Sequence, residues 1–431
     1  MNLNVAASKA MPQTITQKIM ARAAGLTSVK VGSQLRVKPR FVLAYDFPGV
    51  MDVVFKQLKT EFGIQRMRDP SRYGLFIDHM VPPQKPSEEA VHEITRNWAN
   101  ANGVALYERE GIGHQVAAEK GFGLPGALVV HFDRHVSALG AFGTLAFGIR
   151  RQILEAFAFD EVDMQVPQSV KIIFRGRPPA GVMARDVFNH LIARLGPGNC
   201  CDQVLEIEGP AIAKLSVDDR MTICGLATFT GAVSAIIVPD ETTISWLRSK
   251  TDKALEPLYG DSDAEYAAVH EFDLSEVSPY VVIPPSPANV VPLAEIAGQH
   301  IDQGYIGSCV SGRLEDIRAA AHVLKERSIK PGFRLNVIPT SQNIMREAMR
   351  EGLLEVLMKS GAFVSASSCD YCYGKIQALA PGQFALSTGP LNIPGRMGST
   401  EARVYIASAA TIAASAIEGQ IADPRKYFSA H

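Results

Sequence analysis

The chain has 431 residues, of which 47% are hydrophobic and 20% are charged, and its formal net charge is −1. A single hydrophobic core stops growing beyond about 250–300 residues, so we expect two to four domains. A net charge this close to zero provides no general attraction to polyanions, so we expect neither nucleic acid nor a membrane as a partner.

Six cysteines in a chain of this length are too few for a disulfide scaffold, and they favour a reducing compartment, which we take to be the cytoplasm. The longest apolar run, from Ala138 to Ile149, is shorter than the ~20 residues that a membrane-spanning helix needs. The N-terminus carries Lys9, Lys18 and Arg22 without an acid, which leaves a transit peptide open.

Strand and helix patterns alternate from the start of the chain. Thr14 and Gln17 form a capping box for a helix that Gly25 ends, so residues 1–11 are a predicted tail. A strand at 75–77 is followed by a helix that Ser87 caps, with Val91, Ile94 and Trp98 on its apolar face and Gly103 at its end. A buried strand is predicted at 127–132, and an apolar helix or loop at 139–149.

The same rhythm continues to the C-terminus. Alternating Val170, Ile172 and Phe174 predict a strand, and a helix ending at Gly196 follows it. A strand at 234–238 precedes a helix capped by Asp240. Further on, the pattern predicts a helix from Leu314, a strand at 335–338 and a helix capped by Ser341. These alternations indicate an α/β protein.

Two seams divide this pattern into three parts of comparable size. One lies near Val166-Pro167, and the other is the proline-rich stretch from Val282 to Pro292, which suits an extended connection. We therefore predict domains at 12–167, 168–284 and 285–431.

Three cysteines in the last part carry the clearest chemistry. Cys309 lies in the Gly-Ser loop of residues 305–313, and Cys369 and Cys372 form a CxxC about sixty residues later. Three thiolates on two loops suit a metal or iron–sulfur cluster with one open corner. A buried free thiol at Cys309, and a zinc half-site or redox pair at the CxxC, remain open alternatives.

Three histidines follow element ends in the first part, where site residues concentrate. They occur in Asp78-His79, in Gly113-His114 and in Asp133-Arg134-His135, and two of them have an aspartate near enough to orient the imidazole. Each could instead be a surface or capping residue. Other histidines fall in apparent helices or linkers and receive no role: His92, His190, His270, His300 and His322. Arg313 and Arg396 follow glycines and could bind carboxylates or be ordinary surface arginines.

Taken in order, these segments resemble the large subunit of the aconitase and isopropylmalate dehydratase superfamily over nearly the whole chain. The resemblance rests on the segments already quoted and on those at 111–115, 140–148, 219–224, 239–242, 307–316 and 395–398. It implies a three-domain core with a [4Fe–4S] cluster in the cleft between domains. In such enzymes the open iron is a Lewis acid that helps water leave a hydroxy acid.

The resemblance also implies roles for individual residues. Cys309, Cys369 and Cys372 fall on cluster-ligand positions. Five residues fall on active-site positions that handle the leaving hydroxyl: Asp78, His79, His114, Asp133 and His135. Arg396 falls on a position that binds a substrate carboxylate. The swivelling domain that supplies the catalytic base in this family is not seen in the sequence, so we expect a separate small subunit.

This sequence departs from the family pattern at positions around the substrate. Arg134 stands where a serine is usual, Gly225 and Phe229 replace an asparagine and a glutamate, and Ser311 replaces an asparagine. The run at 389–392 has Pro390 and Leu391 and loses an arginine. We expect Arg134 and Ser311 to bind substrate, and the site to be less polar than that of aconitase.

The leading hypothesis is therefore an iron–sulfur hydro-lyase that acts on a hydroxy-dicarboxylic or related hydroxy acid. A second hypothesis is another lyase or isomerase reaction in which His114 or His135 is the acid–base group. A third is a non-enzymatic cluster protein that binds RNA or senses iron, which the net charge of −1 disfavours.

Overall fold

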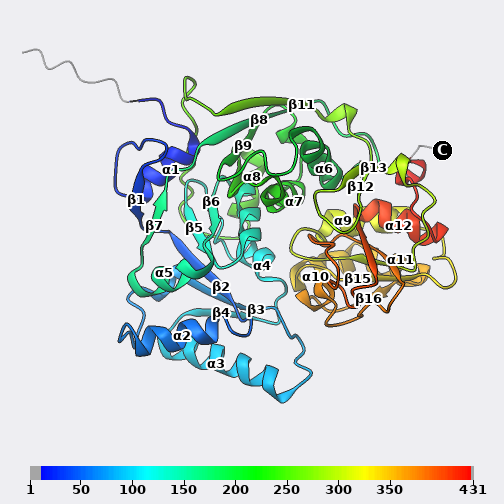
Figure 1. Cartoon of the computed structure of the whole chain (residues 1–431), viewed down its shortest axis with the longest axis horizontal. Coiled ribbons are helices and arrows are strands. Elements are labelled where there is room, and N and C mark those ends of the chain that lie inside the picture. The colour runs from blue at the N-terminus through cyan, green and yellow to red at the C-terminus, as the bar shows by residue number, and fades with distance from the viewer. Residues whose placement is uncertain (1–10, 429–431) are drawn as a thin grey trace, which may run out of the picture.

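The computed structural model describes residues 11–428, so the predicted tail at 1–11 falls almost wholly outside the described residues. Three mixed or parallel sheets and one two-stranded ribbon organise the chain (Figure 1). The expected α/β class is confirmed. The predicted domain limits at 167/168 and 284/285 stay predictions; the strands of the third sheet cross the second limit, because β12 (Tyr280–Val282) lies before it.

The first sheet has five parallel strands in the order β4-β3-β2-β5-β6. Its strands are β2 (Phe41–Tyr45), β3 (Tyr73–Ile77), β4 (Ala105–Glu108), β5 (Leu128–His131) and β6 (Leu145–Gly148). Its helices are α2 (Met51–Thr60), α3 (Pro86–Asn102), α4 (Gly113–Glu119) and α5 (Ile153–Phe159). The chain adds β3 and β4 on one side of β2, then β5 and β6 on the other. The order reverses between β2 and β5, and parallel sheets bind ligands at the carboxyl ends beside such a reversal.

The second sheet has four parallel strands in the order β10-β9-β8-β11. They are β8 (Ser169–Arg175), β9 (Val204–Glu208), β10 (Ser234–Ile237) and β11 (Ala268–Asp273), with helices α6 (Ala184–Leu195), α7 (Val217–Leu226) and α8 (Glu241–Arg248). Gly140 of the first part lies against this sheet, because a Cβ at that position would meet the carbonyl oxygen of Ala235 at 1.8 Å.

The third sheet has seven strands in the order β13-β12-β18-β17-β14-β15-β16, and only β12 runs antiparallel to its neighbours, β13 and β18. The strands are β12 (Tyr280–Val282), β13 (Val290–Pro292), β14 (Gln303–Ile306), β15 (Arg334–Val337), β16 (Phe363–Val364), β17 (Phe384–Ser387) and β18 (Arg403–Ile406). Its helices are α9 (Leu314–Leu324), α10 (Gln342–Arg350), α11 (Leu353–Ser360) and α12 (Ala409–Glu418). Here too the order reverses at the first parallel strand, β14.

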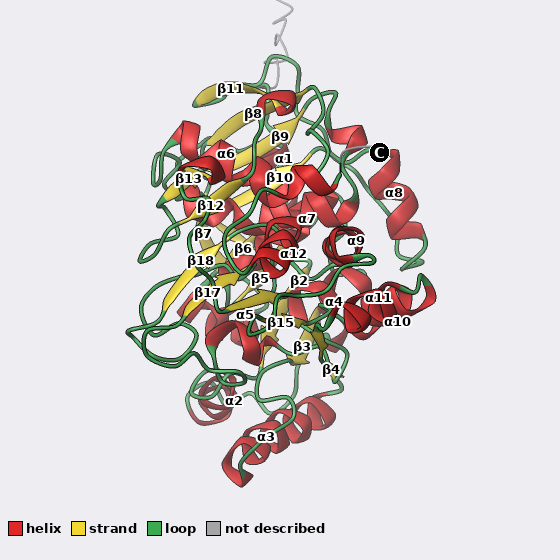
Figure 2. Cartoon of the chain, turned by 90° about the vertical axis from the view of Figure 1, so that its right-hand side faces the viewer, coloured by secondary structure: helices red, strands yellow, loops and turns green. Residues whose placement is uncertain are grey.

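A short helix and a two-stranded ribbon complete the fold. The helix α1 (Ile15–Ala23) has the predicted capping box of Thr14 and Gln17. The strands β1 (Gln34–Val37) and β7 (Val162–Gln165) pair antiparallel beside the first sheet. In Figure 2, α2 and α3 lie at one end of the molecule and β11 lies at the other.

Most predicted elements are present, and the differences have physical causes. The helix α3 begins at Pro86 with Lys85 as its cap, so the prediction of Ser87 as the cap was wrong; proline suits the first helical position, where no N–H bond is needed. Ile94 is 45% exposed, whereas His92, Thr95 and Ala99 are buried, so the predicted apolar face was displaced. The stretch 139–149 divides into the end of a 3₁₀ segment and the strand β6. The stretch from Val282 to Pro292, predicted to be an extended connection, begins at the end of β12 and ends with β13, and these two strands pair antiparallel.

Candidate active site

The predicted site residues follow the ends of parallel strands in two different sheets. In the first sheet, Asp78 and His79 come directly after β3, and Asp133 comes two residues after β5. In the third sheet, Cys309 follows β14, the strand at which the order reverses. The two sets of loops come together because the backbone amide of Cys369 donates a 3.1 Å hydrogen bond to the carbonyl oxygen of Asp78.

The three predicted cluster cysteines are all buried and free of disulfide bonds. Cys369 and Cys372 lie on one 3₁₀ turn with their sulfur atoms 3.8 Å apart. Burial raises the pKa of Cys309 well above its usual value, and the nearby Cys372 thiolate raises it further. Burial, followed by the three nearby cysteines, raises the pKa of Tyr305 well above its usual value.

Arg396 lies against this sulfur cluster. Its Nη2 donates a 3.1 Å hydrogen bond to the Cys372 sulfur. The Cys369 thiol donates to the same sulfur and, together with Arg396 and His79, outweighs burial and lowers the pKa of Cys372 to about 6. A thiolate at neutral pH is the form that binds a metal, so this donor set fits an iron–sulfur cluster.

Asp78 and His79 form a buried ion pair beside the cysteines, with His79 Nδ1 2.6 Å from Asp78 Oδ1. The other carboxylate oxygen accepts a 2.7 Å hydrogen bond from the amide of Gly113. Burial disfavours charge on the imidazole, but the Asp78 carboxylate outweighs this effect and raises the pKa of His79 to about 9. His79 is therefore a protonated imidazolium at neutral pH, able to donate a proton.

Asp133 connects the two other predicted histidines. Its Oδ1 lies 3.2 Å from His114 Nε2 and 3.0 Å from His135 Nδ1, and it also accepts the backbone amide of His135 at 2.8 Å. Burial would raise the pKa of this carboxyl group, yet the two imidazoles hold it well below its usual value. The Nε2 atom of His135 is buried without a hydrogen-bond partner among the described residues, so it is available to a ligand.

Two residues that the sequence analysis did not select complete this histidine group. The ring of Tyr45 lies 4.9 Å from that of His79 and 5.1 Å from that of His131. His131 Nδ1 accepts a 2.7 Å hydrogen bond from the amide of Asp133. Burial, followed by the nearby His114, lowers the pKa of His131 to about 3, so His131 is neutral. Tyr45 is the last residue of β2 and His131 is the last residue of β5, and the apolar residues before them indicate only a buried strand.

The loop of Cys309 is held by Arg313, which is fully buried. Its guanidinium group donates to Gln115 Oε1 at 3.0 Å, to Thr222 Oγ1 at 3.0 Å and to the carbonyl oxygen of Cys309 at 2.9 Å. Arg313 thus joins the helices α4 and α7 to the loop of Cys309. Ser311, in the same loop, is buried at 2% exposure.

The substituted positions are also near the site. The ring of Phe229 lies 6.1 Å from that of His135, centroid to centroid. Arg134 is exposed, and its side chain makes no hydrogen bond or ion pair with any residue in the described range 11–428. It is therefore free to meet a charged ligand or another chain.

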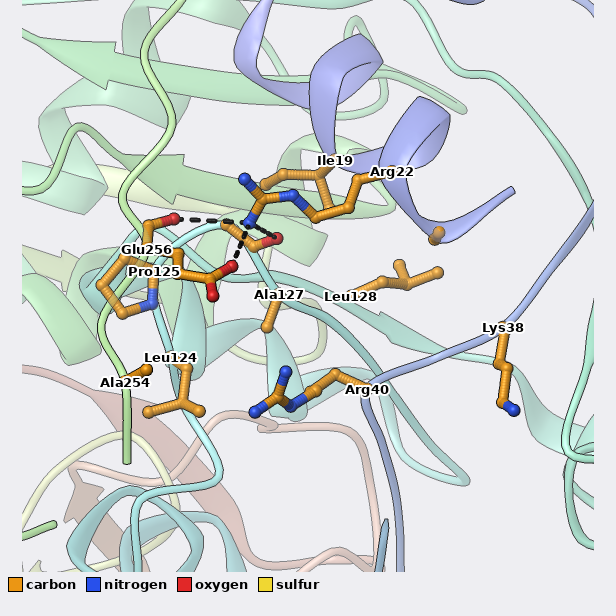
Figure 3. A pocket seen from close by; sticks show the side chains of 12 residues that line it. Ile19, Arg22, Lys38, Arg40, Leu124, Pro125, Ala127, Leu128, Ala254 and Glu256 are labelled. Atoms are coloured by element: carbon orange, nitrogen blue, oxygen red, sulfur yellow. Dashed lines mark hydrogen bonds and ion pairs between the residues drawn. The ribbon is translucent and has the colours of Figure 1, made fainter. Parts of the chain in front are cut away.

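A separate cavity of about 160 Å³ lies between α1 and the loops before β2 and β5 (Figure 3). It is lined by Arg22, Lys38 and Arg40, and Arg22 pairs with Glu256 at 3.3 Å. It contains none of the predicted site residues.

The chain was compared with known proteins. The family model described as aconitase family (aconitate hydratase) matches residues 26–300 and 294–419. The 3-isopropylmalate dehydratase large subunit of Sulfurihydrogenibium is 38% identical, with 96% of each chain covered. Large subunit 1 of the same enzyme from Methanopyrus kandleri is 37% identical, covering 97% of this chain and all of the relative.

Two further comparisons complete these findings. The probable methanogen homoaconitase large subunit of Methanothermobacter thermautotrophicus is 33% identical, covering 96% of this chain and 97% of the relative. The crystal structure of Thermococcus kodakaraensis aconitase X matches with a TM-score of 0.46 and 10% identity, covering 87% of this chain and 89% of that one. Within residues 11–428, no helix has the length and apolar character needed to cross a membrane.

Proposed function

The chain belongs to the aconitase family of iron–sulfur hydro-lyases, and from this premise we propose that it is the large subunit of a dehydratase for an alkyl-substituted hydroxy-dicarboxylic acid. The observation that carries the proposal is the meeting of three buried cysteines with the Asp78–His79 pair at one point. Members of this family bind a [4Fe–4S] cluster. We assign its ligands to Cys309, Cys369 and Cys372.

The bound cluster supplies a Lewis acid at its open iron, which polarises a substrate hydroxyl group. The protein contributes the proton. His79 is charged at neutral pH because its pKa is about 9, and Asp78 fixes its Nδ1 edge, so its Nε2–H donates to the departing hydroxyl. Asp133 holds His114 and His135 in fixed orientations, and His135 Nε2 faces the ligand as a hydrogen-bond group.

The choice of substrate follows from charge and polarity around this group. Arg396 is the carboxylate-binding cation nearest the cysteines, and Arg134 and Ser311 are candidates for further polar contacts. Phe229 places an aromatic ring beside His135, where it favours an alkyl group over a polar one. This chemistry fits an isopropyl-substituted malate, the type of substrate that the names of the dehydratase relatives indicate.

The relatives are named as large subunits, which supports a separate small subunit as partner. That subunit would supply the base that removes the proton from carbon. The cytoplasmic location of the chain itself, which its few cysteines lead us to expect, stays a prediction.

The test is an anaerobic assay of the chain with a reconstituted cluster and a dehydratase small subunit. A panel of isopropylmalate, citrate, homocitrate and malate is followed by the absorbance of the unsaturated product. We expect the highest kcat/KM for isopropylmalate, loss of cluster absorbance and activity in Cys309→Ser, and no loss in the exposed Cys201→Ser. Full cluster and activity in Cys309→Ser would overturn the assignment, and a product formed without loss of water would favour another lyase or isomerase reaction.

A further inference from the structure

A second histidine–aspartate pair lies directly behind Asp78 and His79. His92 of α3 and Asp46, which follows β2, are each 1% exposed. His92 Nε2 lies 2.9 Å from Asp46 Oδ2. Its Nδ1 is 3.7 Å from Glu89 Oε2, beyond hydrogen-bond distance. A buried ionisable pair costs desolvation energy that an apolar pair would not, so its presence here calls for a structural or functional reason.

The pair contacts the backbone of Asp78 and His79 at two atoms. Asp46 Oδ1 accepts a 3.2 Å hydrogen bond from the amide of Asp78. His92 Nε2 lies 3.1 Å from the carbonyl oxygen of His79, so one N–H faces both this oxygen and the Asp46 carboxylate. The two side chains therefore hold opposite ends of the dipeptide that carries the proton donor.

The next two residues are held as well, from the cysteine side. Met80 has a positive φ of 56°, and its amide donates to Asp370, as does the amide of Val81. The residue that follows the dipeptide, Met80, is therefore in a strained backbone conformation, and the surrounding hydrogen bonds must maintain it. Within residues 11–428, Asp46 and His92 are the only residues whose side chains hydrogen-bond to the backbone of Asp78 or His79.

We propose that Asp46 and His92 are positioning residues for His79, fixing the backbone from which it reaches the substrate. This inference rests on the proposed function for its kinetic consequence, but the contacts themselves do not depend on it. Positioning groups behind a reacting residue typically change rate without changing the affinity for substrate, because they set the geometry of proton transfer.

The test uses the holoenzyme with its small subunit and four chains: wild type, His92→Leu, His92→Gln and His190→Leu. Glutamine places an amide N–H near the position of His92 Nε2, whereas leucine removes it. His190 is a matched control, because it is a buried helical histidine whose side chain makes its only hydrogen bond within residues 11–428 to the hydroxyl group of Tyr280, in β12 of the third sheet.

We expect His92→Leu to lower kcat about 10–100-fold with KM changed less than about twofold. His92→Gln should recover most of the lost rate, and His190→Leu should keep wild-type kcat even if it lowers the melting temperature. A parallel loss of kcat in His92→Leu and His190→Leu, or equal loss in leucine and glutamine variants, would overturn the proposal.

Amide hydrogen–deuterium exchange separates this proposal from the function on which it rests. The peptide covering residues 74–80 should exchange at least about tenfold faster in His92→Leu than in wild type, and at a near-wild-type rate in His92→Gln. If wild type has no dehydratase activity on any acid, the proposed function fails while this exchange still decides the positioning role. Unchanged exchange in a folded His92→Leu protein contradicts it. If His92→Leu does not fold, Asp46→Asn, which loses the charge facing His92, is expected to show the same exchange and kcat effects in weaker form.

Discussion

The carboxylate of Asp370 accepts a 2.8 Å hydrogen bond from the backbone amide of Met80, 290 residues earlier in the chain. Its other oxygen accepts the amide of Val81 at the same distance. Asp370 lies between Cys369 and Cys372, so the turn that carries two proposed cluster ligands is tied to the loop that carries the proposed proton donor.

Replacing Asp370 by asparagine should therefore weaken both loops. The asparagine side chain keeps one oxygen as an acceptor, but its NH2 group then faces the second backbone N–H, which is left without an acceptor. We expect a loss of about 1.5–3 kcal/mol in unfolding free energy. Faster loss of cluster absorbance in air should accompany it. The control is Asp273→Asn, at an exposed aspartate that caps a short turn, and this variant should lose clearly less unfolding free energy than Asp370→Asn. Equal losses in the two variants would contradict the structural role of Asp370.

Arg220 should be among the most costly charges to remove. It is fully buried and forms a two-point contact with Asp240, with N–O distances of 2.6 and 2.7 Å, while also donating to Ile212 and Leu215 carbonyl oxygens. We expect Arg220→Met to lower the unfolding free energy by about 3–5 kcal/mol, because it leaves these acceptors unpaired. Arg175 pairs with Glu271 at the surface, where solvent screens the charges, so Arg175→Met should cost far less than Arg220→Met in the same denaturant titration.

His131 predicts how stability depends on pH. Its pKa is about 3 in the folded chain and about 6.5 when unfolded, so below pH ~6.5 the unfolded chain binds a proton that the folded chain does not. Stability should therefore fall as pH drops from 6.5 toward 3. The variant His131→Asn keeps an acceptor for the Asp133 amide but has no group that titrates there. From pH 7 to pH 5, the melting temperature of the wild type should therefore fall more than that of the variant.

Phe229 offers a test of substrate preference. A glutamate there would place a carboxylate near His135 and make the wall polar. We expect Phe229→Glu to lower kcat/KM for isopropylmalate about tenfold or more relative to citrate. Phe229→Leu keeps an apolar wall and should preserve the ranking of the two acids. An unchanged ranking in the glutamate variant would show that this wall does not contact the alkyl group.

The sequence was most informative where a local pattern and a family motif coincide. The capping box at Thr14, the stop at Gly196 and the caps at Asp240 and Ser341 are confirmed, because each depends on residues within one turn. The family resemblance is confirmed by the comparisons, and with it the cofactor. The roles of individual site residues stay predictions.

What the sequence could not provide depends on contacts across the fold. His92 received no role because it lies inside a helix, and only the structure shows its contacts with Asp46 and His79. Tyr45 and His131 lie inside strands, where apolar neighbours conceal a polar function. The buried face of α3 was displaced for the same reason, since the polar His92 turns toward the site while Ile94 faces outward.

The contact between Asp370 and Met80 also sets an order of assembly. The last strand of the first sheet ends at residue 148, so all of its strands are synthesised long before the third sheet is complete. The loop after β3 nevertheless lacks the carboxylate that holds residues 80 and 81 until residue 370 has left the ribosome. A chain shorter than 370 residues therefore lacks the acceptor for the amides of Met80 and Val81, and it also lacks Cys372.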